Sequence, residues 1–352
     1  MRPVSARPLP ATRSRVRLVC VGNADLYRLL TICLLTTGLY GCLSLDADRT
    51  PPRSGPFDSD EVKSYYGAAK DPRRFFLTLY DHVHGPEFKG SNRLHAGQVA
   101  QLPFETPRRG SAPVISVSTT RHRIIASLVD TSSSENWIAV QQVAGAAGVA
   151  LSPPAFRASP EHVRDPVDGY LSHLDALKLD GLRVESVLSF LRGSWDGLGP
   201  IARGVEKPEP GLVLGMRFLR PFAFVQFDFP ERRITFSTDR AYKPLKDLLL
   251  TSAPYVDDMG PLQIAAAIDG KQTRVLLDTA GSFDIILPQA RDGLLRHLAI
   301  GGLELHDLEI AFDETVSGTS AVPRIGRGVL SRYRMTLDSR SKVVHFEDPS
   351  RD

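Results

Sequence analysis

Short apolar and alternating segments, separated by turn residues, follow one another along the chain from Gln101 onward. Alternation with a period of two, bounded by Gly, Pro, Asp and Ser, is typical of β-strands and predicts an all-β protein. The preceding residues 61–100 carry a weaker pattern, in which the stretch from Arg73 to Tyr80 fits a helix as well as a strand. We therefore assign no function to residues 61–100.

Two of the apolar segments end in the same way, in an Asp-Thr pair followed by small residues. The first is Ile-Ala-Ser-Leu-Val-Asp-Thr-Ser-Ser-Ser at 125–134, and the second is Arg-Val-Leu-Leu-Asp-Thr-Ala-Gly-Ser at 274–282. A buried strand that stops at an acid places the carboxylate at the edge of a sheet. Two such strands in one chain predict that the carboxylates of Asp130 and Asp278 meet.

The segments around these two acids also repeat in the same order, as an internal repeat requires. An alternating strand and a turn precede each acid, a hairpin follows it, and an apolar segment with Gly leads to a second hairpin. The matched segments are 114–122 with 262–271, 177–184 with 298–305, 214–219 with 325–330, and 227–236 with 337–346. The repeat predicts two structurally similar lobes, which we place at residues 61–248 and 249–352.

The two halves differ in length directly after the acid. From Asp130 to Gly181 there are 51 residues, whereas from Asp278 to Gly301 there are 23, so the first half carries about 28 extra residues. Pro and Asp-Gly pairs within the insertion are turn signals around an expected hairpin at residues 150–176. A long loop beside an acid could serve as a lid that excludes water.

All three cysteines, Cys20, Cys33 and Cys42, lie in the first 42 residues, so the remaining chain has no disulfide framework and no thiolate metal site. Residues 1–42 contain six Arg and a 12-residue apolar stretch at 29–40, which is typical of a signal peptide and too short to span a membrane. The segment ends in Leu-Tyr-Gly-Cys, which resembles the bacterial lipobox.

Two alternatives follow for Cys42. Lipid chains on its thiol would hold the protein at the cell envelope without spanning the membrane, and Leu43 in the next position favours the outer membrane. Otherwise Cys42 is an ordinary residue after a cleaved peptide, and the protein is periplasmic or secreted. Residues 43–60, rich in Pro, Ser and Asp, are predicted to be a tether between this anchor and the fold.

Composition and charge exclude several classes of protein. The chain is 42% hydrophobic and 24% charged, which excludes disorder. Its net charge of +3 comes from the leader, since the other residues include 37 basic and 39 acidic ones, and a nearly neutral surface excludes nucleic-acid binding. Motifs for a serine hydrolase elbow, a zinc protease and a phosphate loop are absent. His82 and His84 have no acidic or thiol partner close by, so we interpret them as surface residues and predict neither a metal nor a cofactor.

The repeated pattern resembles that of the pepsin-like and retropepsin-like aspartic proteases over residues 102–346. The resemblance implies two β-barrel lobes with a cleft between them, in which Asp130 and Asp278 hold a water that hydrolyses a polypeptide substrate. It also implies a flap on the N-terminal lobe alone, which agrees with the insertion. Because both lobes belong to one chain, we expect a monomer.

The resemblance also implies roles for the residues around the acids. Thr131 and Thr279 would brace the two loops across the lobe interface, and the hydroxyl of Ser133 would bind the first acid. Gly215 and Gly326 would pack beneath the acid loops. Tyr170 is the aromatic residue that would lie on the flap.

The chain departs from the family pattern at four positions. Ser132 and Ala280 stand where Gly usually follows Asp-Thr, Gly281 stands where a hydroxyl residue is frequent, and Arg324 replaces an apolar residue. Three hypotheses therefore stay open: an active aspartic endopeptidase, a catalytically silent relative that binds peptides or envelope components, and acids that each merely cap a turn.

Overall fold

The structure, a computed structural model, describes residues 43–44, 78–80, 87–89, 92–105, 112–120, 124–139, 149–158, 167–192, 210–257, 260–289, 292–312 and 322–351. The predicted signal peptide, Cys42, nearly all of the tether, and His82 and His84 lie outside these residues. Of the ambiguous stretch, residues 78–80 form strand β2 (Thr78–Tyr80), which pairs with β3 (Glu87–Lys89).

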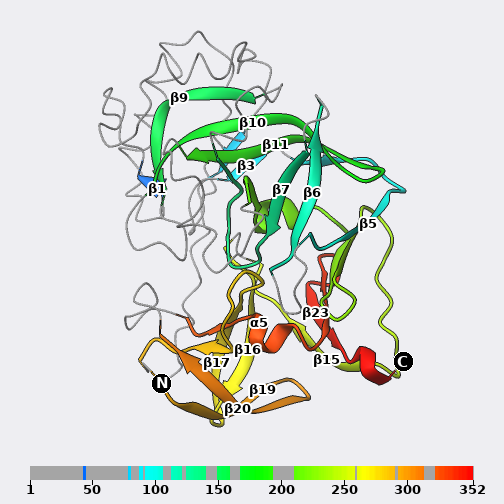
Figure 1. The fold of residues 1–352 in the computed structure, drawn as a ribbon, viewed down its shortest axis with the longest axis vertical. Coiled ribbons are helices and arrows are strands. Elements are labelled where there is room, and N and C mark those ends of the chain that lie inside the picture. The colour runs from blue at the N-terminus through cyan, green and yellow to red at the C-terminus, as the bar shows by residue number, and fades with distance from the viewer. Residues whose placement is uncertain are drawn as a thin grey trace, which may run out of the picture.

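The described chain is built of strands, as predicted (Figure 1). Its first half contains a closed barrel of six of them. Around the ring the strands are β6 (Val114–Thr119), β7 (Ile124–Val129), β12 (Leu212–Leu214), β8 (Trp137–Ala139), β11 (Leu182–Arg192) and β10 (Val167–Leu179). Pairing of β10 with both β6 and β11 closes the ring. Strand β12 lies between β7 and β8, parallel to the first and antiparallel to the second.

The second half contains a second closed barrel with the same order of pairings. Its strands are β16 (Gln263–Ile268), β17 (Lys271–Leu277), β21 (Arg324–Ile325), β18 (Ile285–Ile286), β20 (Leu303–Ala311) and β19 (Leu294–Ile300). Each pairing has the same sense as its counterpart in the first barrel, including the parallel pair β17–β21, which matches β7–β12. The predicted repeat is therefore confirmed as two equivalent barrels.

A six-stranded sheet joins the two halves. Its order is β15 (Leu249–Pro254), β23 (Val343–Glu347), β22 (Arg334–Asp338), β13 (Phe224–Asp228), β14 (Arg233–Ser237) and β5 (Val99–Pro103). Each half contributes three neighbouring strands, and the halves meet where β13 pairs antiparallel with β22. Gln226 faces Thr336 at the middle of this ladder and donates a hydrogen bond of 3.1 Å to its hydroxyl. The halves are thus related by an approximate twofold axis near this pair.

The first half carries additions that the described second half lacks. Strand β9 (Val149–Ala158) pairs antiparallel with β10, which agrees with the predicted hairpin at residues 150–176. Two short strands, β1 (Leu43–Ser44) and β4 (Arg93–Leu94), pair with β9 and β11. Short helices α4 (Met216–Leu219) and α5 (Arg327–Leu330) occupy equivalent places in the two halves, and a 3-10 turn, η3 (Pro349–Arg351), follows the last strand.

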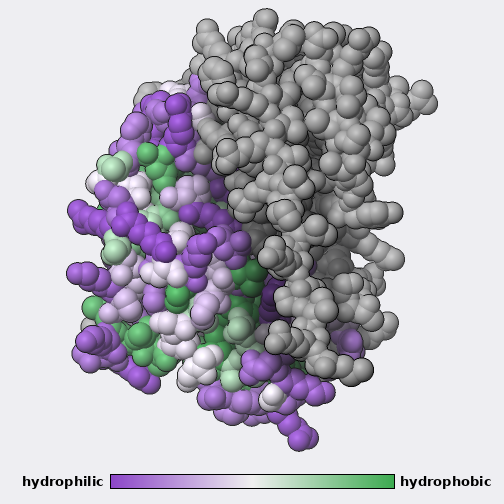
Figure 2. Space-filling model, turned by 180° about the vertical axis from the view of Figure 1, so that it is seen from behind, coloured by the Kyte–Doolittle hydropathy of each residue, from purple (hydrophilic) through white to green (hydrophobic). Residues whose placement is uncertain are grey.

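The interior is one apolar cluster that includes residues of both barrels and of the shared sheet. Large aromatic side chains pack beneath α4, where Phe222 lies 5.1 Å from Phe236 between ring centroids. Hydrophilic and hydrophobic residues are mixed in small areas over the face of the described part that Figure 2 shows. No helix among the described residues is both long and apolar enough to cross a membrane.

Candidate functional site

Each of the two acids directly follows a strand of its barrel. Asp130 follows β7 and Asp278 follows β17, and the two residues are 0% and 4% exposed. The backbone N–H of Asp130 donates to the carbonyl of Leu214 at 3.0 Å, and that of Asp278 donates to Ile325 at 2.8 Å. Equivalent parallel strands therefore hold both acids at equivalent places in the two halves.

Two threonines, Thr131 and Thr279, connect the acid loops across the interface between the halves. The Thr131 hydroxyl donates to the carbonyl of Leu277 at 2.6 Å, and the Thr279 hydroxyl donates to that of Val129 at 2.8 Å. Each hydroxyl also accepts the backbone N–H of the opposite threonine, at 3.3 and 3.0 Å. The bracing contact that the resemblance implied is thus present, and it fixes the two acid loops relative to each other.

Thr131→Val is expected to destabilise the protein by about 2–4 kcal/mol, because the carbonyl of Leu277 and the N–H of Thr279 would each lose a buried partner. Thr119→Val is the matched control, since the buried Thr119 hydroxyl has no hydrogen-bond partner among the described residues. Urea unfolding measures both variants. Equal stability of the two variants would contradict a structural role of the threonine brace.

One oxygen of each carboxylate binds its own loop. Asp130 Oδ1 accepts the N–H of Ser132 at 2.8 Å and its hydroxyl at 2.7 Å. Asp278 Oδ1 accepts the N–H groups of Ala280 at 3.0 Å and Gly281 at 2.7 Å. The turn-capping hypothesis therefore accounts for Oδ1. The turn-capping hypothesis does not account for Asp130 Oδ2, which is buried and has no hydrogen-bond partner among the described residues.

The prediction that Ser133 binds the first acid is wrong, because Ser132 makes this contact. The N–H and hydroxyl two residues after an Asp are the groups that its carboxylate reaches in a tight turn. The Ser133 hydroxyl instead donates to the carbonyl of Glu135 at 2.8 Å, and its carbonyl accepts the N–H of Met216 at 2.7 Å. The residue that replaces Gly in this loop thus supplies a second hydrogen bond to the acid.

The pKa of Asp130 is raised from 3.8 to about 7, mainly by burial and next by the negative charge of Asp278. The hydrogen bonds from Ser132 and the positive charge of Arg324 act against this rise. The crossed threonine contacts place the two acid loops against each other, which explains why one carboxyl group acts on the other. Asp130 therefore retains its proton up to about neutral pH, beside a second carboxylate.

The two predicted glycines make close backbone contacts with the loops that follow the acids. A Cβ atom on Gly215 would lie 2.2 Å from the carbonyl oxygen of Glu135, and one on Gly326 would lie 2.3 Å from that of Phe283. Both glycines have extended backbones, with φ of −89° and −98°. Glycine is therefore required at both positions because there is no space for a side chain. Its small size allows the corner between strand and helix to pack directly on the acid loop.

Gly215→Ala is expected to cost about 3 kcal/mol, because the added methyl group meets rigid backbone and cannot be accommodated by a side-chain rotation. The matched control is Gly181→Ala, since a Cβ atom there has no neighbour within 4 Å. The control should change the free energy of unfolding by less than about 0.5 kcal/mol. A neutral Gly215→Ala variant would show that the corner is not tightly packed.

Three buried arginines surround the acid loops and were not predicted to be buried. Arg217 forms an ion pair with Glu135 in the first loop, with Nη2 at 2.6 Å from Oε1. Arg327 donates from Nε to the carbonyl of Ala280 in the second loop at 3.2 Å. Arg324, on β21, is 6% exposed. The sequence offers two signals: Arg217 and Arg327 follow the two glycines within two positions, and Arg324 stands where the family pattern has an apolar residue.

The expected flap aromatic, Tyr170, belongs to β10, and its backbone pairs with Ala155 and Leu191. Its side chain lies outside the described residues.

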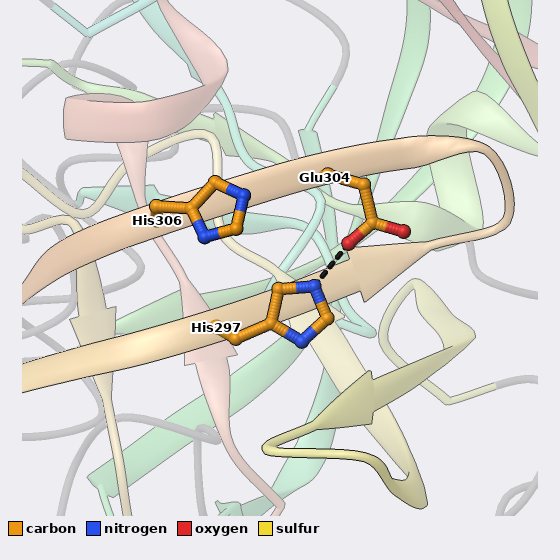
Figure 3. A group of neighbouring side chains, drawn as sticks. All are labelled: His297, Glu304 and His306. Carbon is orange, nitrogen blue, oxygen red and sulfur yellow. Dashed lines mark hydrogen bonds and ion pairs between the residues drawn. The ribbon is translucent and has the colours of Figure 1, made fainter.

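One group of metal-ligand side chains lies together in the described part of the chain, and it was not predicted. It consists of His297, Glu304 and His306 on the β19–β20 hairpin (Figure 3). The signal in the sequence is that the two histidines are equally distant from the Gly301-Gly302 turn, so that they face each other across the hairpin.

The chain matches no protein-family model and no curated protein sequence.

Proposed function

We propose that the protein is an aspartic endopeptidase that hydrolyses peptide bonds with a water molecule activated by Asp130 and Asp278. The observation that carries the proposal is the pair of buried acids at equivalent places in two barrels, tied together by the crossed threonines. This arrangement supports the resemblance to pepsin-like and retropepsin-like proteases, which combine the same doubled elements in the same order.

The chemistry needs one acid and one base, and two neighbouring carboxyls supply both. Since the two groups cannot both ionise at low cost, they share one proton. The raised pKa of Asp130 favours that residue as the proton holder. Asp278 then accepts a proton from the water as its oxygen attacks the peptide carbonyl, while Asp130 protonates the carbonyl oxygen. Asp278 then passes the proton that it took from the water to the amide nitrogen as the C–N bond breaks, and Asp130 takes back a proton from a hydroxyl of the intermediate as the carboxyl group of the product forms.

The departures from the family pattern leave the donors to the acids in place. Ser132 provides an N–H and a hydroxyl to Asp130, and Ala280 still provides its N–H to Asp278. The replacements therefore remove no hydrogen-bond donor from either acid.

A screen of peptide mixtures tests the proposal. The full chain is incubated with peptides of varied sequence between pH 4 and pH 8, and new termini are identified by mass spectrometry. Cleavage is expected below about pH 7 and should decline above it, as Asp130 loses the proton that it must donate. Asp278→Asn should reduce cleavage strongly, and full cleavage by this variant would contradict the proposal.

The second function is that of a catalytically silent relative which binds peptides or envelope components. The observation that favours it is the replacement of both loop glycines by Ser132 and Ala280. Peptide binding without cleavage at any pH would support this function over the first.

The leader supports a location at the cell envelope. We propose that Cys42, if lipidated, anchors the protein to the outer membrane as a monomer acting on polypeptide substrates. Incorporation of a radiolabelled fatty acid that is lost in Cys42→Ala would support this anchor.

A further inference from the structure

Two histidines and a glutamate gather on the outer face of the β19–β20 hairpin. His297 and His306 are direct partners across the two strands, and their rings stack with centroids 5.2 Å apart. Glu304 lies two residues before His306 and so points to the same face of the strand. Figure 3 shows the three side chains converging, with Glu304 hydrogen-bonded to Nε2 of His297.

We propose that His297, Glu304 and His306 form a binding site for Zn²⁺. One potential ligand atom from each residue lies within 4.8 Å of the other two. With Zn–N and Zn–O bonds of about 2.0–2.2 Å, tetrahedral ligand atoms lie about 3.3 Å apart. The separations of the three atoms therefore need to change by about 1.5 Å at most, with the hydrogen-bonded His297–Glu304 pair moving apart to admit the metal, and side-chain rotation can supply these changes.

The register of the hairpin explains why the glutamate reaches the histidine. Glu304 pairs with Ala299, whose methyl side chain leaves room above it. The carboxylate can therefore cross diagonally to His297. A bulkier residue at position 299 would block this path.

The ligand set is chemically selective. Two imidazole nitrogens and one carboxylate oxygen suit Zn²⁺ and neighbouring transition metals, whereas Ca²⁺ and Mg²⁺ prefer sets of oxygen atoms only. Glu304 and His306 are exposed, so solvent can complete the coordination. The hairpin from Leu294 to Ala311 carries three acidic residues and one basic residue, which favours a cation.

The backbone that carries the ligands is held in place. The residues that alternate with them, Leu298 and Leu305, point into the barrel and are buried. The carbonyl of His297 accepts the N–H of Asp269 at 3.0 Å, and the turn at Gly302 donates to the hydroxyl of Thr251 at 3.1 Å. Such anchoring reduces the conformational entropy that the hairpin would lose on binding the metal.

The site is separate from the two acids. His297 contacts Asp269 in the turn that precedes β17, while Asp278 follows the other end of this strand. A strand of this length spans roughly 20 Å. The inference therefore does not rest on the proposed peptidase activity.

The test is a titration of the full chain with Zn²⁺ in competition with a chromogenic chelator, together with Tm with and without Zn²⁺. The wild type should bind Zn²⁺ and show a higher Tm in its presence. Since second-shell changes alone weaken metal sites 10- to 100-fold, loss of a ligand in His306→Ala or Glu304→Gln should weaken this binding at least about 100-fold.

His95→Ala is the matched control, because His95 is an exposed histidine next to a glutamate in the other half of the chain. It should bind Zn²⁺ like the wild type. Glu304→Gln preserves the shape of the side chain. If its Tm without metal equals that of the wild type, the fold of the variant is intact. Zn²⁺ affinity and Tm shift that are the same in all variants, or no binding by the wild type, would overturn the proposal and leave a surface ion pair.

Discussion

Asp130→Asn is expected to reduce the rate of peptide hydrolysis about 10³-fold or more. The amide has the shape of the carboxyl group, and its oxygen can still accept the two hydrogen bonds of Ser132. It cannot hold and donate the shared proton, and general acid–base catalysis contributes about 10²- to 10⁴-fold. The rate constants of both proteins are measured on one peptide from the cleavage screen.

The design of this experiment separates loss of chemistry from loss of structure. Asp278→Asn should cause a loss of the same order, and the double variant should lose little more, since the two acids act as one unit. Asp247→Asn, at an exposed position, is the control and should keep full activity. Full activity in either single variant would exclude the shared dyad.

The same change, Asp130→Asn, is expected to stabilise the protein by up to about 4 kcal/mol at pH 8. The pKa of Asp130 is about 7 in the folded protein, against 3.8 for an unperturbed aspartate side chain. Below pH 3.8 the group is protonated in both the folded and the unfolded state. Between pH 3.8 and 7 unfolding releases its proton, so wild-type stability falls as pH rises. Asn cannot ionise, so the free energy of unfolding of the variant does not fall in this way.

Urea unfolding between pH 4 and pH 8 tests this effect without any substrate. The difference in free energy of unfolding between variant and wild type should be close to zero at pH 4 and reach its maximum above pH 7. Asp247→Asn should show no such trend. A variant that is no more stable than the wild type at pH 8 would mean that Asp130 ionises freely in the folded protein.

Local features of the site could be predicted from the sequence because they depend on contiguous residues. An apolar run that stops at Asp-Thr marks the end of a buried strand, and the structure ends β7 and β17 at those points. The two equivalent barrels could be predicted from the repeat, because each half follows the same order of segments. The predicted packing of Gly215 and Gly326 beneath the acid loops is likewise found, as close backbone contacts in both halves.

Other features depend on register and long-range contact, which periodicity does not contain. The donor to Asp130 is Ser132 because of the shape of the loop, and a neighbouring serine in the sequence was equally plausible. The grouping of His297 with Glu304 and His306 depends on a cross-strand register. Arginine is rarely buried without a partner. The burial of Arg217 is explained by Glu135, 82 positions away in the chain.

The shared sheet has a consequence for how the molecule comes apart. Strand β13 needs β22 to cover its edge, and each threonine satisfies backbone groups of the opposite half. Detaching one half would leave the other with an open strand edge and unpaired polar atoms in its interior. The two barrels, although each is a closed ring of strands, are therefore expected to unfold together as one cooperative unit.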